Sequence, residues 1–245
     1  MTEHLFNGQR ILIAGGNSGM GLALVKHCLD SGARVIMAGR NSDKLNAARE
    51  LLAQHQHLST AVLDITDEAS VMQFFKSVDS LDHIISTAAN MEGAYGFLPD
   101  LPQSAFQRAF ASKVLGPWLL AKYGKDALAQ TGSITFVSGI AAYRPMPRGS
   151  IVAAANAAIE GLAKALAVEL APIRVNVVSP GWVDTPIWKD VLGDGKDQAL
   201  QAMAEKLPVA RIGQVDDIAG AMMFVMSNGF TTGSVLHCDG GHRLV

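Results

Sequence analysis

Residues 10–21 read RILIAGGNSGMG and join a short apolar run to a glycine-rich turn. The run at 10–14 is too short for a helix, and its unbroken Ile and Leu content is typical of a strand buried on both faces. The turn leads into residues 20–30, whose apolar residues recur at helical spacing. A strand, a glycine-rich turn and a helix in this order predict a cradle for the pyrophosphate of a dinucleotide.

Three glycines fit the separate demands of such a cradle. Gly15 permits a tight turn, Gly19 lets the backbone approach a phosphate, and Gly21 allows the helix to pack closely on the sheet. The first turn of the helix then offers free N–H groups and a partial positive charge to the anion. The alternative is a glycine-rich turn without a ligand, but its place between a strand and a helix favours nucleotide binding.

Short apolar runs alternate with helix-length amphipathic segments along the rest of the chain. The expected strands span residues 10–14, 34–38, 60–64, 83–87, 133–137, 174–178 and 234–238. The expected helices span residues 20–30, 44–54, 68–78, 103–123, 152–170 and 216–226, with Asp43 and Asp67 as N-caps and Gly32 just after the first helix. This pattern predicts an α/β protein of the Rossmann type: a single domain over residues 1–245, with a doubly wound, seven-stranded parallel sheet and helices on both faces.

The composition limits which binding partners and which cellular location we expect for the protein. The 245 residues carry a formal net charge of −2 without a run of Lys or Arg, so we expect neither a nucleic acid nor a membrane as partner. Cys28 and Cys238 lie in apolar segments that favour buried thiols, and the scattered histidines predict no metal site. The absence of a signal-like N-terminus and of a run of about 18 apolar residues predicts a soluble cytoplasmic protein. A hydrophobic content of 49% favours a subunit interface.

The second expected strand is followed by Gly39, Arg40 and Asn41. A site specific for NAD usually has an acidic residue here, whereas NADP needs donors for its 2′-phosphate. No carboxylate is present to repel the phosphate, and Arg40 offers a planar fork of N–H donors. The sequence therefore predicts NADP(H), bound mainly through Arg40, with Ser18 and Asn41 as further donors. The alternative is that Arg40 is only a solvated loop residue.

Several features, in order along the chain, resemble one family. The glycine loop has the spacing TGxxxGxG with Ala14 in place of Thr, Asp64 ends the third expected strand, and PGWVDTP follows at 180–186. A closing helix and strand end at residues 239–241. Together these features resemble the short-chain dehydrogenase/reductase family over nearly the whole chain. The resemblance implies that the cofactor contacts Gly15, Asn17, Ser18, Gly19, Met20, Arg40, Asn41, Asp64, Ile65, Ala88, Ala89, Asn156, Pro180, Gly181, Val183 and Thr185.

The reductases of this family use a tyrosine as general acid and base, a lysine four residues later, an upstream serine and an asparagine on the preceding helix. Alignment through GLAKALAVEL, residues 161–170, puts the tyrosine position at Val152 and the lysine position at Asn156. The serine position falls on Gly139 and the asparagine position on Lys113. The resemblance therefore implies an atypical member that lacks the YxxxK pair.

Four residues are candidates to replace the missing catalytic groups. Hydride transfer builds negative charge on the substrate oxygen, and this charge must be stabilised and protonated. Tyr143 and Ser138 offer hydroxyl groups. Asn156 offers an amide for the nicotinamide ribose, and Lys113 offers a positive charge. Each also has a purely structural interpretation, which is favoured for Tyr143 and Lys113 taken singly but not for Asn156 and Ser138.

The loops expected at the carboxyl ends of the strands, residues 91–98, 140–147 and 182–203, are rich in Trp, Met, Phe, Tyr and Pro. They predict a small apolar or aromatic carbonyl substrate under a lid around residues 182–206, or else a packed interface. The resemblance implies a homodimer or homotetramer. The leading hypothesis is an NADPH-dependent carbonyl reductase with a non-standard active site. The alternatives are a catalytically degenerate NADP(H)-binding sensor or partner subunit and, as a weaker one, a non-redox lyase or isomerase.

Overall fold

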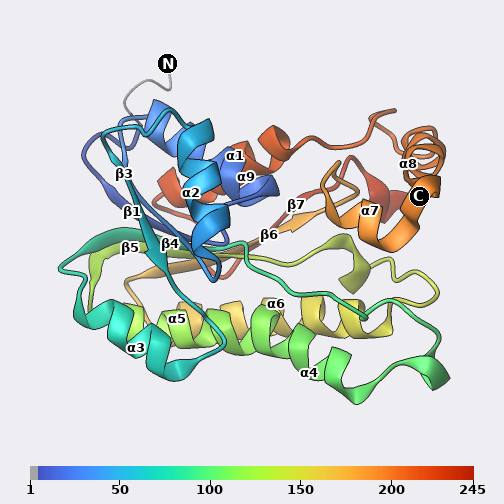
Figure 1. Ribbon diagram of the computed structural model, residues 1–245, viewed down its shortest axis with the longest axis horizontal. Helices are drawn as coiled ribbons and strands as arrows, with labels where there is room; N and C mark the ends of the chain where they lie inside the picture. Colours follow the sequence, from blue (N-terminus) through green and yellow to red (C-terminus); the bar gives the residue numbers. More distant parts are fainter. Residues whose placement is uncertain (1–4) are drawn as a thin grey trace.

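The computed structural model describes residues 5–245, without the side chains of residues 189, 190 and 192. Within them, a parallel sheet of seven strands lies between two layers of helices, which confirms the predicted fold class (Figure 1). The strands are β1 (Arg10–Ala14), β2 (Arg34–Gly39), β3 (Leu58–Val62), β4 (Leu81–Ser86), β5 (Leu128–Val137), β6 (Arg174–Pro180) and β7 (Val235–Cys238). Their order across the sheet is β3-β2-β1-β4-β5-β6-β7.

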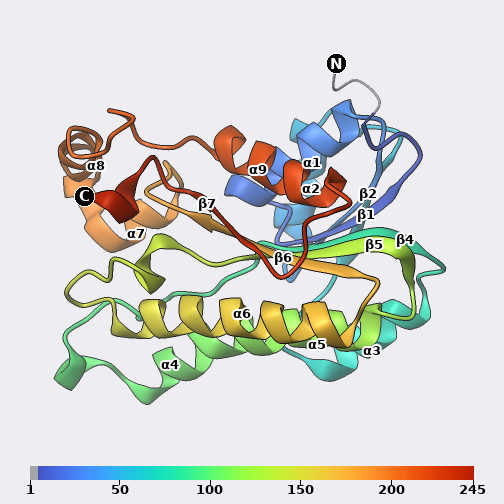
Figure 2. The same ribbon diagram turned by 180° about the vertical axis from the view of Figure 1, so that it is seen from behind.

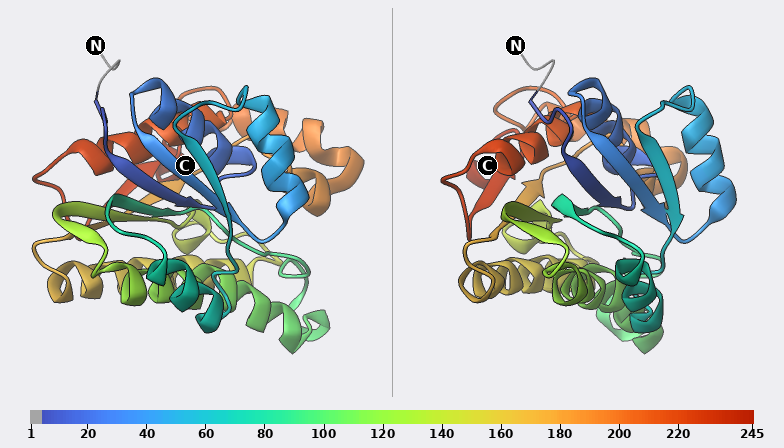
Figure 3. Two further views of the ribbon diagram at one scale, coloured as in Figure 1. Left: turned by 60° about the vertical axis from the view of Figure 1, so that its left-hand side comes forward. Right: turned by 90° about the vertical axis from the view of Figure 1, so that its left-hand side faces the viewer.

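The strand order reverses between β1 and β4, and this reversal positions the site. The two strands are hydrogen-bonded neighbours, and Ala14 pairs with Ser86 at their carboxyl ends. The chain leaves β1 toward one face of the sheet and β4 toward the other, so the loops that follow them diverge. Open α/β sheets bind their ligands between such loops. The side views in Figure 3 show the twisted sheet between its helical layers.

Helices α1 (Gly19–Asp30), α2 (Ser42–Leu51) and α9 (Val215–Ser227) cover one face of the sheet. Helices α3 (Glu68–Lys76), α4 (Gln103–Phe110), α5 (Gly116–Gly124) and α6 (Ser150–Glu169) cover the other (Figures 1 and 2). In β1, Ile11 and Ile13 pack into the core under α1 and α9, whereas Leu12 and Ala14 pack into the core over α5 and α6. Burial on both faces is why the strands read as continuous apolar runs.

Some local predictions need correction and others are confirmed. β3 begins and ends two residues earlier than expected, so Asp64 lies just beyond the strand. The N-cap of α2 is Asn41, whose side chain accepts from the Lys44 N–H at 2.9 Å, and Asp43 lies in the first turn instead. An amide oxygen one residue before the helix reaches that N–H group directly. Asp67 caps α3 and Gly32, with φ +85°, follows α1, as predicted.

The expected helix at 103–123 is interrupted by a π-helical turn, Ala111–Leu115, between α4 and α5. Pro117 stands just after it and has no N–H to donate to the carbonyl of residue 113, four residues earlier. Such turns widen a helix locally and are frequent at functional sites. The turn carries Lys113 at its centre.

The predicted lid region contains two helices that the sequence analysis did not predict. They are α7 (Ile187–Leu192) and α8 (Lys196–Ala204), joined by a 3-10 turn, Gly193–Gly195. Figure 1 shows them beyond the ends of β6 and β7. Asp184 forms an ion pair with Lys196 at 2.7 Å, which ties the segment after β6 to the start of α8.

Helix α6 is long and apolar enough, by length and composition alone, to cross a membrane, with a mean hydropathy of 1.6 over 18 residues. In the fold, 44% of that window is buried. Ile159, Ala163 and Leu166 pack against the sheet. The place of α6 as a core helix accounts for this composition.

Candidate active site

The glycine turn after β1 is fitted against the end of β4. A Cβ on Gly15, which has φ +87°, would lie 2.6 Å from the Ala88 nitrogen. A Cβ on Gly21 would lie 2.2 Å from the Gly15 oxygen. The Thr87 hydroxyl donates to the carbonyl oxygens of Ala14 and Gly15 at 3.2 and 3.1 Å. Backbone contact of this kind leaves room for glycine only and fixes the turn in place.

The mouth of the same turn is open. Gly19 has φ +51°, and a Cβ there would meet nothing within 4 Å. Ser18 is the N-cap of α1, yet its hydroxyl makes no capping hydrogen bond. The first N–H groups of α1 and the Ser18 hydroxyl are thus free to bind an anion, as a helix N-terminus does. These residues fit the pyrophosphate of a dinucleotide, and Met20 beside them packs against the core.

The ends of β2 and β3 form the adenosine side of this cradle. Arg40 is exposed, and in the part of the chain that the structure describes it has no side-chain hydrogen bond or ion pair. A Cβ on Gly39 would lie 2.8 Å from Asn17 Oδ1, so glycine at this strand end lets the two loops meet. Asn41 uses its oxygen to cap α2, which leaves its amide N–H group for a ligand. Arg40 is therefore exposed just after β2, at the position where the sequence predicts the 2′-phosphate.

Asp64 and Ile65 lie in the loop after β3. Asp64 Oδ1 accepts from the Thr66 N–H at 2.9 Å and from its hydroxyl at 2.7 Å, and Oδ2 has no hydrogen bond within the described structure. Ile65 is buried, and a Cβ on Gly116 would lie 2.7 Å from its side chain. The loop is thereby held against the start of α5, with one carboxylate oxygen of Asp64 available.

Lys113 and Ser138 meet at the end of β5. Lys113 Nζ donates to the Ser138 carbonyl oxygen at 3.1 Å. Among the side chains that the structure describes, which exclude that of Asp190, no carboxylate lies within ion-pair distance of this ammonium group. Burial lowers the pKa of Lys113 to about 8, because a charged amine is less favourable away from water. The described part of the site therefore holds a cation without a carboxylate partner, and burial favours the loss of its proton.

Asn156 fills the space beside Gly139. Its Nδ2 lies 2.9 Å from where a Cβ on Gly139 would be. Its Oδ1 is buried and has no hydrogen-bond partner in the described structure. An unpartnered buried acceptor is unfavourable, so this oxygen is placed to accept from a ligand hydroxyl such as that of a ribose. Val152, one helical turn earlier, is buried in an apolar cluster with Ala105 and Ile151.

The hydroxyl groups of Ser138 and Tyr143 both donate to a carboxylate that the sequence analysis did not single out. Ser138 Oγ lies 2.7 Å from Glu160 Oε1, and the Tyr143 hydroxyl lies 2.5 Å from Glu160 Oε2. Burial and Glu160 raise the pKa of Tyr143 to about 12. One sequence signal was available: Glu160 follows Asn156 by four residues in a largely apolar helix, so both lie on one helix face.

The segment after β6 packs against the end of β7. A Cβ on Gly181 would lie 2.7 Å from the Asp239 Cα, and the Gly181 N–H donates to the Cys238 carbonyl oxygen at 3.0 Å. Pro180 ends β6, and Val183 pairs with Gly213 in an isolated bridge. Thr185 follows this bridge, and its carbonyl accepts from the Trp188 N–H at 3.3 Å. The expected cofactor contacts Pro180, Gly181, Val183 and Thr185 thus share one anchored segment.

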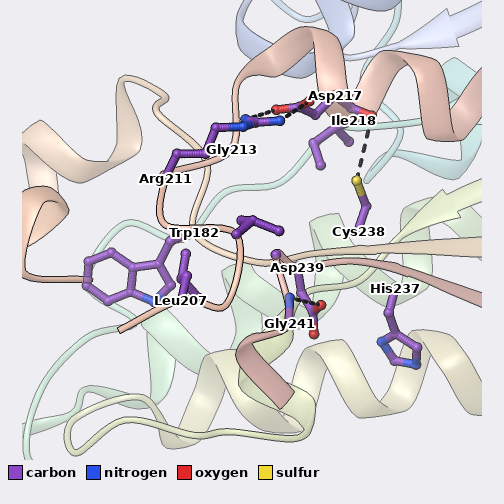
Figure 4. A pocket seen from close by; sticks show the side chains of 12 residues that line it. Trp182, Leu207, Arg211, Gly213, Asp217, Ile218, His237, Cys238, Asp239 and Gly241 are labelled. Carbon is purple, nitrogen blue, oxygen red and sulfur yellow. Dashed lines mark hydrogen bonds and ion pairs between the residues drawn. The ribbon is translucent and has the colours of Figure 1, made fainter. Parts of the chain in front are cut away.

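A cavity of about 310 Å³ lies beside that segment (Figure 4). Trp182 and Leu207 line one side of it, and His237 and Cys238 line the other. Arg211 binds Asp217 in a two-pronged ion pair at 2.6 and 2.8 Å, so these wall charges compensate each other. The 207–213 and 237–241 parts of the lining lie outside the loops that the sequence predicted for the substrate.

Neither cysteine is paired, and burial raises the pKa of Cys28 to about 12. The structure gives no group of three His, Cys, Asp or Glu side chains with metal-binding geometry in the region it describes.

Comparison with known proteins identifies the family to which this chain belongs. A profile described as Enoyl-(Acyl carrier protein) reductase matches residues 14–243. The short-chain dehydrogenase/reductase malC of Malbranchea aurantiaca is 34% identical over 258 residues, which cover 99% of this chain and 97% of the relative. The solved structure of the MalC reductase/Diels-Alderase from that organism has a TM-score of 0.91 at 33% identity and full coverage, 100% of each chain. A small-chain dehydrogenase in complex with NADPH has a TM-score of 0.83 at 34% identity, covering 98% of this chain and 100% of the other. The chain therefore belongs to the short-chain dehydrogenase/reductase family of NAD(P)H-binding oxidoreductases.

Proposed function

We propose that this protein is an NADPH-dependent reductase of a small apolar or aromatic carbonyl compound, with Lys113 as the proton donor. The observation that carries the proposal is the Lys113 ammonium group, held 3.1 Å from the Ser138 carbonyl oxygen without a compensating carboxylate in the described residues. A cation in this position stabilises negative charge that develops on a substrate oxygen.

The choice of NADPH over NADH rests on Arg40. Its guanidinium is exposed just after β2, and Gly39 and Asn41 beside it carry no negative charge. The Ser18 hydroxyl and the Asn41 amide are further donors within the same group of loops. The related dehydrogenase solved with NADPH supports this assignment.

The active site is proposed to be atypical for the family because Val152, Asn156 and Gly139 stand at the positions of its tyrosine, lysine and serine. Val152 is an integral part of an apolar cluster. Asn156 occupies the space that a side chain at position 139 would need. These replacements are sterically compatible with one another, which supports the proposal that the residues of the site changed together.

Bound NADPH would supply a hydride to the carbonyl carbon of the substrate. As the carbonyl π-electrons move to oxygen, Lys113 donates the proton that completes the alcohol, and the resulting neutral amine regains a proton from solvent. Asn156 Oδ1, a buried acceptor without a partner in the described structure, would accept from a ribose hydroxyl and so orient the cofactor. Proton donation by a positioned side chain contributes roughly 10²–10⁴-fold to such a rate.

Lys113 is a better candidate for the proton donor than the two hydroxyl groups. Ser138 and Tyr143 already donate to Glu160, and the Tyr143 pKa, raised to about 12, makes this phenol a weak acid. The pKa of about 8 for Lys113 lies much closer to physiological pH, as efficient general acids require.

The substrate type and the assembly belong to the same proposal. The stacked rings of Trp182 and Trp188, with centroids 4.3 Å apart, offer an apolar wall in the 182–206 lid. Exposed Phe106 stacks on Phe110 at 4.3 Å on α4, an apolar surface that a second subunit of a cytoplasmic homodimer or homotetramer would cover.

The test is NADPH oxidation, followed by absorbance, against a panel of aryl ketones, diketones and quinones. Turnover with at least one compound, lost in Lys113→Met, is the expected result. Tight NADPH binding without turnover of any compound would favour the sensor or partner-subunit alternative. Conversion of a substrate without consumption of NADPH would favour non-redox chemistry, and the relative described as a reductase/Diels-Alderase makes this outcome worth measuring.

A further inference from the structure

We propose that Glu160 is a positioning residue of the active site, which holds the Ser138 side chain and thereby aims the main-chain carbonyl that binds Lys113. This inference rests on the proposed function, because it gives the Lys113 ammonium group its place. Glu160 lies on α6, one helical turn after Asn156.

Ser138 connects the two ionisable side chains through different atoms. Its N–H donates to the Val178 carbonyl oxygen at 2.9 Å, which continues the sheet pairing beyond β5. Its hydroxyl donates to Glu160 Oε1 at 2.7 Å, and its carbonyl oxygen accepts from Lys113 Nζ at 3.1 Å. All three contacts meet at Ser138, so the Glu160 contact and the N–H bond together restrict the residue whose carbonyl Lys113 binds.

Gly139 makes this support necessary. It follows Ser138 directly and has no side chain that could anchor the peptide between them. Glycine has more conformational freedom than any other residue, so this peptide group can rotate unless its neighbours hold it. Glu160 and Lys113 provide the side-chain contacts that do so.

A carboxylate is a poor choice for filling this space if its role is only structural. Glu160 is 6% exposed, and the described structure gives it no ion pair with Lys, Arg or His. Such burial carries a large desolvation penalty, and an apolar residue of similar size often replaces buried charge without loss of stability. The two oxygens instead accept one hydroxyl each, from two different segments.

The second contact of Glu160 anchors a loop rather than Lys113. The Tyr143 hydroxyl donates to Oε2, and the Tyr143 ring packs edge-on against His237 with centroids 4.7 Å apart. Tyr143 ends the 3-10 helix Ile140–Ala142, so this contact fixes the loop after β5. Loss of the Tyr143 contact should therefore affect the loop after β5, whereas loss of the Ser138 contact should affect Lys113.

The experiment measures the titration of Lys113 directly in the protein without cofactor or substrate. Trace acetic anhydride is added over a pH series, and the acetylation of Lys113 is followed by mass spectrometry, because only the neutral amine reacts. We expect Glu160→Gln and Ser138→Ala to lower the midpoint by about one pH unit, since the ammonium loses an aligned acceptor. Tyr143→Phe leaves the midpoint unchanged. Glu169→Gln, an exposed change on the same helix, is the matched control.

An unchanged midpoint in both Glu160→Gln and Ser138→Ala, with only a lower Tm, would make Glu160 structural and overturn the proposal. Equal shifts in these variants and in Tyr143→Phe would indicate general loosening and would also overturn it. If Glu160→Gln does not fold, the acetylation midpoint of Lys113 in Ser138→Ala decides between these outcomes. Because labelling needs neither NADPH nor substrate, its outcome is independent of whether the protein reduces a carbonyl.

Discussion

The amide nitrogen of Asn156 lies 2.9 Å from the point where a side chain on Gly139 would begin. The two residues stand where the family resemblance expects a lysine and a serine, and each leaves room for the other. Gly139 has φ 169°, an extended conformation open to any residue. The restriction at position 139 is therefore one of space and not of backbone strain.

Gly139→Ser is expected to destabilise the fold by about 1–3 kcal/mol, the usual range for overpacking. Gly139→Ser combined with Asn156→Ala removes the clash, so the double variant should recover part of that loss. Urea unfolding of the single and double variants measures both changes. Strictly additive losses would contradict the contact.

The glycine turn gives a prediction with a matched control. Gly21→Ala places a Cβ 2.2 Å from the Gly15 oxygen, so it should greatly reduce both stability and NADPH binding. Gly220→Ala lies in the interior of α9 with nothing within 4 Å, and should stabilise the protein by about 0.5–1 kcal/mol through helix propensity. Thermal unfolding distinguishes the two, and equal effects would show that the turn is not tightly packed.

Arg40→Asp tests the cofactor assignment. Loss of a charge-assisted hydrogen bond and gain of a repelling carboxylate should weaken NADPH binding at least about 10-fold. NADH carries no 2′-phosphate, so its affinity should not fall. Isothermal titration with both cofactors measures the ratio. An unchanged preference for NADPH would remove Arg40 from the site.

Lys113 gives a stability prediction that needs no substrate. Its pKa falls to about 8 in the fold from an ordinary value of 10.5, so between these values the unfolded chain binds more protons than the folded one. Stability should therefore rise with pH across that window. At pH 7 the folded protein carries the penalty for its partly buried ammonium group, so Lys113→Met should raise the urea midpoint there. The difference should shrink as the pH passes 8 and approaches 10.5. A pH-independent difference would contradict the burial of a titrating amine.

The sequence was sufficient for the sheet and the cofactor cradle because each strand buries both faces and glycine has few substitutes in the turn. The strand β1 and the cap at Asp67 have the predicted positions. The π-helical turn around Lys113 and the helices α7 and α8 were not predicted, since each depends on contacts outside its own segment. Glu160 gave only a weak signal, because its partners Ser138 and Tyr143 lie 22 and 17 residues away.

The most direct test of the central claim is single-turnover oxidation of NADPH by stopped flow, at pH 7, with one ketone that the protein reduces. The account predicts that Lys113→Met lowers the hydride-transfer rate by about 10²–10⁴-fold while NADPH affinity is retained. It also predicts that the rate of the unmodified protein falls as the pH rises through about 8, because the proton donor is the ammonium form. An unchanged rate in Lys113→Met, with the activity lost instead in Tyr143→Phe, would contradict the account.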